Sequence, residues 1–230
     1  MSLLTIVTKA CSRLSLAVPT TVMANTNAQV VQIKELAQEE GKNLASKVIW
    51  KALTAEKTFT TTAAAVQTGA VPSDFDYLIP DTMFNRTARR RIDGPISADE
   101  WQVLQAAIIG RVFSAFRFRG SNILITPTPT AGETVAYEYV TKNWCQSSVG
   151  AGQSVWTADT DTALIDEELH TQGIVWRFLK MRGMDHQDAF RDYTQNVLQA
   201  IMREGSRPRL YLDGTNRILR APNRDYFVST

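Results

Sequence analysis

The hydrophobic periodicity of this chain changes twice, and that change most constrains what the chain can fold into. Over residues 3–14, and again from Asn27 to about Ala52, apolar residues recur every three or four positions, which predicts amphipathic helices. From residue 53 to 158 the sequence is rich in Thr, Val and aromatic residues with Gly and Pro between them, which is typical of short strands and turns. Helical spacing then returns. The pattern predicts an α+β protein.

The order of these segments predicts how they are organised. We expect residues 1–204 to form a single domain, because the two helical regions, 1–52 and 159–204, can pack together as one bundle. The β-rich residues 53–158 would then be an insertion in that bundle, built as small antiparallel sheets. Residues 205–230 would form an extended C-terminal arm.

Polar residues mark where the helices should begin. Ser97 and Glu100 have the spacing of a capping box, so we expect one short helix near residues 97–109 inside the insertion. The other expected caps are Asn25 or Thr26 for the second helix, and Asp159, Thr160 or Asp161 for the first helix after the insertion.

Alternation at period two predicts the strands of the insertion. Phe116 and Phe118 alternate with arginines, and Gly120 with Ser121 supplies a turn, so residues 116–125 should form a hairpin with one solvent-exposed face. A second strand should place one set of large residues on its core-facing side: Val135, Tyr137 and Tyr139.

The C-terminal helical region should be an antiparallel pair, because Gly183 separates two apolar stripes. We expect Trp176 to be a core residue. The two stripes are Ile165, Leu169, Trp176 and Leu179 before the glycine, and Phe190, Tyr193, Val197 and Ile201 after it.

Little in the sequence points to catalysis. Known nucleotide-binding and hydrolase motifs are absent, and Cys11 and Cys145 stand alone without metal-ligand spacing. Glu167 and His170 have the Glu-x-x-His spacing of di-iron bundles, but the second copy that such a site needs is missing, so we expect an exposed helix histidine. We assign no catalytic, cofactor-binding or metal-binding residue and expect a protein that is not an enzyme.

A hydrolase that works through a pair of carboxylates stays open as a competing hypothesis. Asp74 and Asp76 are the candidate acids, although a turn cap is the favoured role for Asp74. Convergence of either acid with a second one in a cleft would support catalysis.

Arginines cluster in two places within the insertion. Arg86, Arg89, Arg90 and Arg91 fall in an expected loop, and Arg117 and Arg119 fall on the hairpin. They are candidates for contacts with DNA phosphates or with a neighbouring subunit. A solvated loop explains the first group at least as well, and keeping a strand edge soluble is the favoured role of the second. The net charge of +2 gives no support to general nucleic-acid binding.

The C-terminal arm is too apolar for a solvated tail and too broken by Pro208, Gly214 and Pro222 to fold alone. It needs a surface to lie on, either its own domain, where residues 210–219 would form a small hairpin, or a partner. The candidate docking residues are Arg207, Arg209, Leu210, Tyr211, Leu212, Ile218, Leu219, Arg220, Arg224, Tyr226 and Phe227.

Targeting signals give only general expectations. Lys9 and Arg13 interrupt the apolar start, which therefore lacks the hydrophobic region of a signal peptide, and no run is long enough to span a bilayer. We expect synthesis and assembly in the cytoplasm and no membrane partner.

Four blocks of sequence resemble the head-to-tail adaptor (connector) proteins of tailed bacteriophages, particularly those of short-tailed phages. These blocks cover most of residues 2–204. They are SLLTIVTKACSRL; SDFDYLIPDTMFNRT with GPISADEWQVLQA; FRFRGSNILITPTPTAGETVAYEYVTKNW; and DTDTALIDEELHTQGIVWRFLKMRGMDHQDAFRDY.

The resemblance implies a structural virion protein at the head-tail junction. Such proteins form a homo-oligomeric ring, commonly of twelve copies, that binds the portal protein after genome packaging. The ring extends the channel for passing double-stranded DNA without reading its sequence, and it presents a platform to a tail or nozzle protein. The C-terminal arm commonly reaches the portal. A stand-alone nucleic-acid-binding protein, using the Arg-rich loop and the tail, is the alternative.

Overall fold

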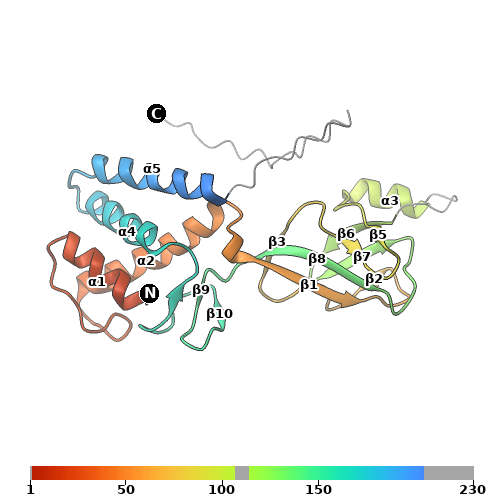
Figure 1. The fold of residues 1–230 in the computed structure, drawn as a ribbon, viewed down its shortest axis with the longest axis horizontal. Helices are drawn as coiled ribbons and strands as arrows, with labels where there is room; N and C mark the ends of the chain where they lie inside the picture. Colours follow the sequence, from red (N-terminus) through yellow and green to blue (C-terminus); the bar gives the residue numbers. More distant parts are fainter. Residues whose placement is uncertain (1, 107–113, 205–230) are drawn as a thin grey trace.

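The N-terminal and C-terminal helices gather at one end of the molecule together with a few short strands, and the longer strands lie at the other end together with one short helix (Figure 1). A computed structural model gives the structure of the protein and describes residues 2–106 and 114–204. The helices are α1 (Leu3–Arg13), α2 (Ala28–Lys47), α3 (Ala98–Ala106), α4 (Glu167–Met181) and α5 (Gln187–Glu204), with a 3₁₀ turn, η1, at Lys51–Leu53. The strands are β1 (Thr54–Thr60), β2 (Val66–Gln67), β3 (Phe75–Leu78), β4 (Phe84–Asn85), β5 (Arg90–Arg91), β6 (Ala115–Arg119), β7 (Asn122–Thr126), β8 (Thr134–Thr141), β9 (Cys145–Gln146), β10 (Gly152–Gln153) and β11 (Thr162–Ala163).

The largest sheet is built around β8. One side of β8 pairs along its length with β1, from Thr54 opposite Val140 to Thr60 opposite Thr134. Its other side pairs with β3 and then with β4, and β5 lies beyond β4. All of these pairs are antiparallel, which confirms the predicted α+β class with antiparallel sheets.

The predicted hairpin is also present. β6 and β7 pair with Arg119 opposite Asn122, so Gly120 and Ser121 form the two-residue turn, and Gly120 has the positive φ of +60° that this turn requires. β2 completes this second sheet on the far side of β7. A third small sheet joins β9 to β10 and β11.

Each end of the molecule has its own hydrophobic core. In the helical part, α4 packs against α1, α2 and α5, and the apolar faces of these helices bury Leu3, Ile33 and Ile174 completely. In the β-rich part, Val135, Tyr137 and Tyr139 of β8 lie in the core, as their alternation predicted. Ala136 points to the opposite face and is also buried, because Phe84 of β4 lies opposite it.

The second helix is shorter than its periodicity predicted. α2 ends at Lys47 rather than near Ala52, and the Trp50 indole donates a buried hydrogen bond to the Leu44 carbonyl 2.7 Å away. This bond satisfies a carbonyl of the last helical turn, and η1 follows. The cap was also wrong: the Asn27 side chain caps the helix, and Asn25 accepts from the Asn27 amide instead.

The first helix after the insertion starts later than predicted. α4 is capped by Asp166, whose carboxylate accepts from the Glu168 amide at 2.8 Å. The expected caps serve the preceding loops, because Asp159 accepts from the amides of Val22 and Met23, and Asp161 accepts from Thr157 and Ala158. In the sequence, strand β11 lies between these expected caps and the observed cap Asp166. The prediction failed because each aspartate can cap a loop as well as a helix.

Two other local predictions have clear outcomes. The capping box is confirmed: Glu100 accepts from the Ser97 amide at 3.0 Å and the Ser97 hydroxyl accepts from the Glu100 amide at 3.3 Å. The loop expected around Arg86–Arg91 is instead a short hairpin, in which Phe84 lies opposite Arg91 and Asn85 opposite Arg90. The Asn85 side chain accepts from the Ala88 amide and so shapes its turn.

A buried ion pair joins three helices of the bundle. Glu40 of α2 is fully buried and pairs with Arg177 of α4, which is only 7% exposed. The Tyr193 hydroxyl of α5 donates to the same carboxylate at 2.5 Å, and burial raises the pKa of Tyr193 to about 12. Burial lowers the pKa of Arg177. No sequence motif predicted this cluster.

Glycine 173 makes room for the buried carboxylate. A Cβ at this position of α4 would lie 2.2 Å from Cδ of Glu40, a separation that side chains do not tolerate. Glu40 cannot move away easily, because Arg177 and Tyr193 both hold its oxygens. The burial of Glu40 therefore depends on a glycine at position 173.

Substitution of Glu40 should therefore be costly. We expect Glu40→Leu to lower the free energy of unfolding by about 3–5 kcal/mol, because it leaves the Arg177 charge and the Tyr193 hydroxyl buried without their acceptor. Glu39→Leu is the matched control: Glu39 also approaches Arg177, at 3.4 Å, but is 66% exposed, so its loss should cost less than about 1 kcal/mol. Urea unfolding followed by tryptophan fluorescence measures both. Equal losses would show that the buried pair has no special role.

Candidate functional site

The first arginine group is partly neutralised by its own surroundings. Arg86 pairs with Glu56 of β1, and Arg91 pairs with Asp81 and, at 3.5 Å, with Asp93. Arg89 and Arg90 are exposed and make no ion pair with any described residue. Only these two members of the group are free to meet a phosphate or a partner's acidic side chain.

The second arginine group lies elsewhere in the β-rich part. Asp93 forms a parallel bridge with Ala115, and from there the chain runs beside β6 toward Ile96. Arg91 precedes this bridge and Arg119 follows it, so the two groups extend in opposite directions along the strands. The structure does not gather the arginines into one basic patch.

The predicted docking residues between Arg207 and Phe227 lie outside the described residues. The point where the arm starts is described, however. Glu204 ends α5, and its carboxylate accepts a hydrogen bond from the Lys51 amide at 3.0 Å. The arm therefore begins at the junction between the helical and the β-rich parts, beside the segment that leads into β1 (Figure 1).

His170 is not the exposed helix histidine that the sequence suggested. Its side chain is fully buried and packs against the rings of Trp144 and Trp156, with centroids 5.9 Å and 6.2 Å away. Neither ring nitrogen has a hydrogen-bond partner among the described residues. Burial lowers the pKa of His170 to about 4, so the ring is neutral at physiological pH.

The Glu-x-x-His spacing does not produce a metal site. Glu167 lines a surface pocket, whereas His170 points into the core. Within residues 2–106 and 114–204 the structure contains no group of three or more His, Cys, Asp or Glu side chains arranged to hold a metal ion.

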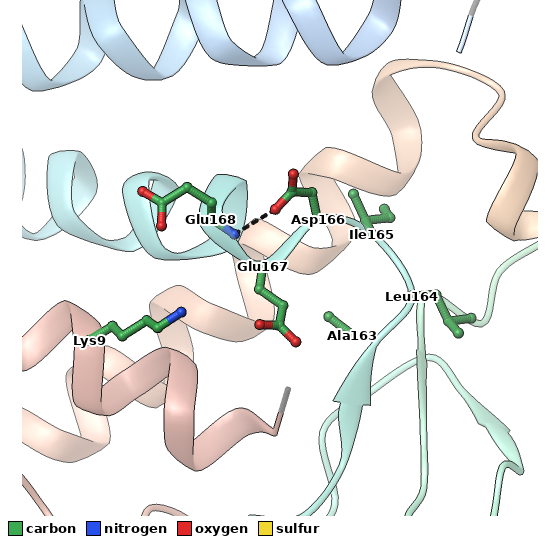
Figure 2. A pocket seen from close by; sticks show the side chains of 7 residues that line it. All are labelled: Lys9, Ala163, Leu164, Ile165, Asp166, Glu167 and Glu168. Carbon is green, nitrogen blue, oxygen red and sulfur yellow. Dashed lines mark hydrogen bonds between the residues drawn. The ribbon is translucent and has the colours of Figure 1, made fainter. Parts of the chain in front are cut away.

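A pocket of about 380 Å³ lies where α4 begins, beside α1 (Figure 2). Three consecutive acidic residues, Asp166, Glu167 and Glu168, line it together with Lys9 and the segment Ala163–Ile165. Glu168 is held by Arg13 at 2.7 Å, and Asp166 is engaged in capping α4. Asp166 thus serves the start of α4, and Glu168 links α4 to α1.

Asp74 also has a structural role. Its carboxylate accepts from the Thr141 hydroxyl at 2.9 Å and from the Tyr139 hydroxyl at 3.1 Å, which ties the start of β3 to β8. Burial and the neighbouring carboxylate raise the pKa of Tyr139 to about 12. Both carboxylate oxygens of Asp74 therefore accept hydrogen bonds, and the side chain of Asp76 in β3 is exposed. Neither acid lines the pocket at the start of α4.

Trp176, expected in the core, is only partly buried. Its ring packs edge-on against Phe190 at 5.0 Å and lies 4.7 Å from the Arg177 guanidinium. Phe190 itself is 46% exposed, because α5 covers α4 without being covered on its own outer face by any described residue.

None of the described helices is both long enough and apolar enough to cross a membrane.

The buried histidine gives a pH dependence that can be measured. Because the folded-state pKa of about 4 lies below the unfolded value of 6.5, the unfolded chain binds a proton first as pH falls. We expect the free energy of unfolding to drop by about 1.5 kcal/mol between pH 6.5 and 5.0. In His170→Phe that drop should largely disappear, whereas His186→Phe, which changes the chain's other histidine, should keep it. Denaturant unfolding at a series of pH values measures this drop in each variant. An unchanged slope in His170→Phe would contradict this account.

Comparison with known proteins places the chain in a family. The family described as SU10 adaptor protein matches residues 1–221, which includes both cores and the first part of the C-terminal arm. A search of curated proteins finds no significant match. Since the match covers nearly the whole chain, this protein belongs to the SU10 adaptor protein family, consistent with the phage head-to-tail adaptor that its sequence resembles.

Proposed function

We propose that this protein forms a ring beneath the phage portal, extends the DNA channel and provides the attachment platform for the tail. The family match over residues 1–221 carries this proposal, because it covers the bundle, the β-rich insertion and the root of the arm together. The shape of the molecule supports it: two separate cores offer one part for the ring and another for the tail side (Figure 1).

The C-terminal arm is the proposed portal-docking element. From Gly205 onward it carries five arginines and two aspartates, a local charge of 5 minus 2, or +3, among interspersed Leu, Ile, Tyr and Phe residues. Such a segment suits an acidic groove on a partner, where apolar side chains supply affinity and arginines supply orientation. Binding to the partner offsets the entropy that the arm loses on ordering.

The insertion is the proposed contact with DNA or with neighbouring subunits. Arg89, Arg90, Arg117 and Arg119 are the arginines of that set that form no ion pair with a described acidic side chain, so they can act there. A channel should not hold DNA tightly, and four scattered arginines per subunit fit that requirement better than one dense patch would.

Deletion of the arm tests the docking role. We expect a chain lacking residues 206–230 to stay folded, with a cooperative unfolding transition, and to lose binding to purified portal rings, because the deletion removes the proposed docking residues. Co-sedimentation with portal rings measures binding. A double substitution on the described surface, Met184→Ser with Met202→Ser, is the control and should bind normally. Normal binding of the deleted chain would refute the docking role.

The nucleic-acid-binding alternative makes a different prediction. A stand-alone DNA-binding protein would bind duplex DNA as a free chain, and its affinity would fall steeply as salt rises, because each neutralised phosphate releases a counterion. The proposed adaptor should show only weak DNA binding before assembly. Titration of labelled duplex DNA at two salt concentrations separates the two functions.

A further inference from the structure

Strand β1 is an edge strand whose outer side lacks a partner among the described residues. It pairs with β8 on one side over all seven of its positions, and the sheet order ends with it. Seven residues of open strand are long for an unprotected edge, which proteins usually cover, shorten or charge. Figure 1 shows β1 running from the junction along the β-rich part.

Hydrogen bonds of the neighbouring strand show which backbone groups of β1 face outward. The Glu138 amide donates to the Thr82 hydroxyl at 3.1 Å, and the Glu138 carbonyl accepts from the Ile79 amide at 3.0 Å. Both groups of Glu138 therefore face away from β1. Its partner Glu56 must direct its own N–H and C=O to the open edge, and by alternation so must Thr58.

The two faces of β1 beside this edge differ in character. On the exposed face, Glu56 lies directly opposite Glu138, a like-charge pair in the closer of the two antiparallel geometries, and Arg86 compensates it from one side. On the other face, Ala55 and Phe59 are half-buried against the β-rich core. A strand added here should present a cation to Glu56 and apolar residues beside Ala55 and Phe59.

The chain leaves the described region next to this edge. Glu204 is bonded to the Lys51 amide, and β1 starts three residues after Lys51. Residues 205–208 span up to about 13 Å when extended, so they can bring Arg209 level with Thr54. Because α5 ends where β1 begins, the arm would run in the same direction as β1.

The sequence at the base of the arm matches what the edge requires. After Pro208, a residue suited to the first position of a strand, the chain reads Arg209, Leu210, Tyr211, Leu212. In a strand, Arg209 and Tyr211 share one face and the two leucines share the other. The arginine would lie on the side of Glu56, and the leucines would extend the apolar face of Ala55 and Phe59.

We propose that residues 209–212 of the arm add to the sheet of their own chain as a parallel strand on the outer edge of β1. This strand anchors the base of the arm, so that residues 213–230 leave the molecule in a fixed direction toward their docking site. The pairing does not depend on the portal, and it goes beyond the proposed function.

Hydrogen exchange of single amides in the full chain, followed by NMR without portal, tests this pairing. We expect the amides of Glu56 and Thr58 to exchange at least about ten-fold faster after the double substitution Leu210→Pro with Leu212→Pro, which removes two strand residues. The matched control, Ile218→Pro with Leu219→Pro, alters the arm beyond the proposed strand and should leave these amides protected. The Lys57 amide, which faces β8, should stay protected in every variant.

Three outcomes would overturn the proposal. The amides of Glu56 and Thr58 could exchange in the unsubstituted chain as fast as freely exposed amides. Their protection could persist in the Leu210→Pro, Leu212→Pro variant, so that another segment covers the edge. Their protection could fall on dilution, so that a second copy covers it. Portal binding is scored separately, so failure here leaves the adaptor assignment unaffected, and failure of portal binding leaves this pairing intact.

Discussion

The buried ion pair between Glu40 and Arg177 is the interaction on which the arrangement of the bundle depends. Two charges in a low-dielectric core are costly unless each is fully engaged, and here α2, α4 and α5 each supply one partner, the last being Tyr193. Slipping any of these helices by one residue would leave a buried charge uncompensated. The pair therefore fixes the position of α5, and with it the place where the arm leaves the molecule.

The helical and β-rich parts are coupled by the chain that runs through β8. Its residues Tyr137 and Tyr139 belong to the β-rich core, whereas Val140 and the following Trp144 belong to the helical core. Gly41 of α2 permits this connection, because a Cβ there would lie 2.3 Å from the Trp144 ring. Trp144 in turn packs against His170 together with Trp156, so these three rings form one aromatic cluster within the helical part.

The sequence predicts periodic features well and single polar contacts poorly. The helix at Leu3–Arg13, the hairpin at β6 and β7, and the core face of β8 follow from repeated spacing, to which several residues contribute. The cap of α4 was misplaced because Asp159, Asp161 and Asp166 are equally good caps in isolation, and only tertiary contacts assign each one. Glu40 could have been recognised, since it falls on the apolar stripe of Ile33, Ala37 and Leu44, where a charge demands a buried partner. No local signal marks the burial of His170.

The mass of the purified full-length chain, measured alone and after mixing with portal rings, tests the central claim most directly. The adaptor account predicts a chain that is monomeric alone and that adds to the portal as a ring of fixed stoichiometry. A chain that stays monomeric in the presence of portal rings would contradict the account.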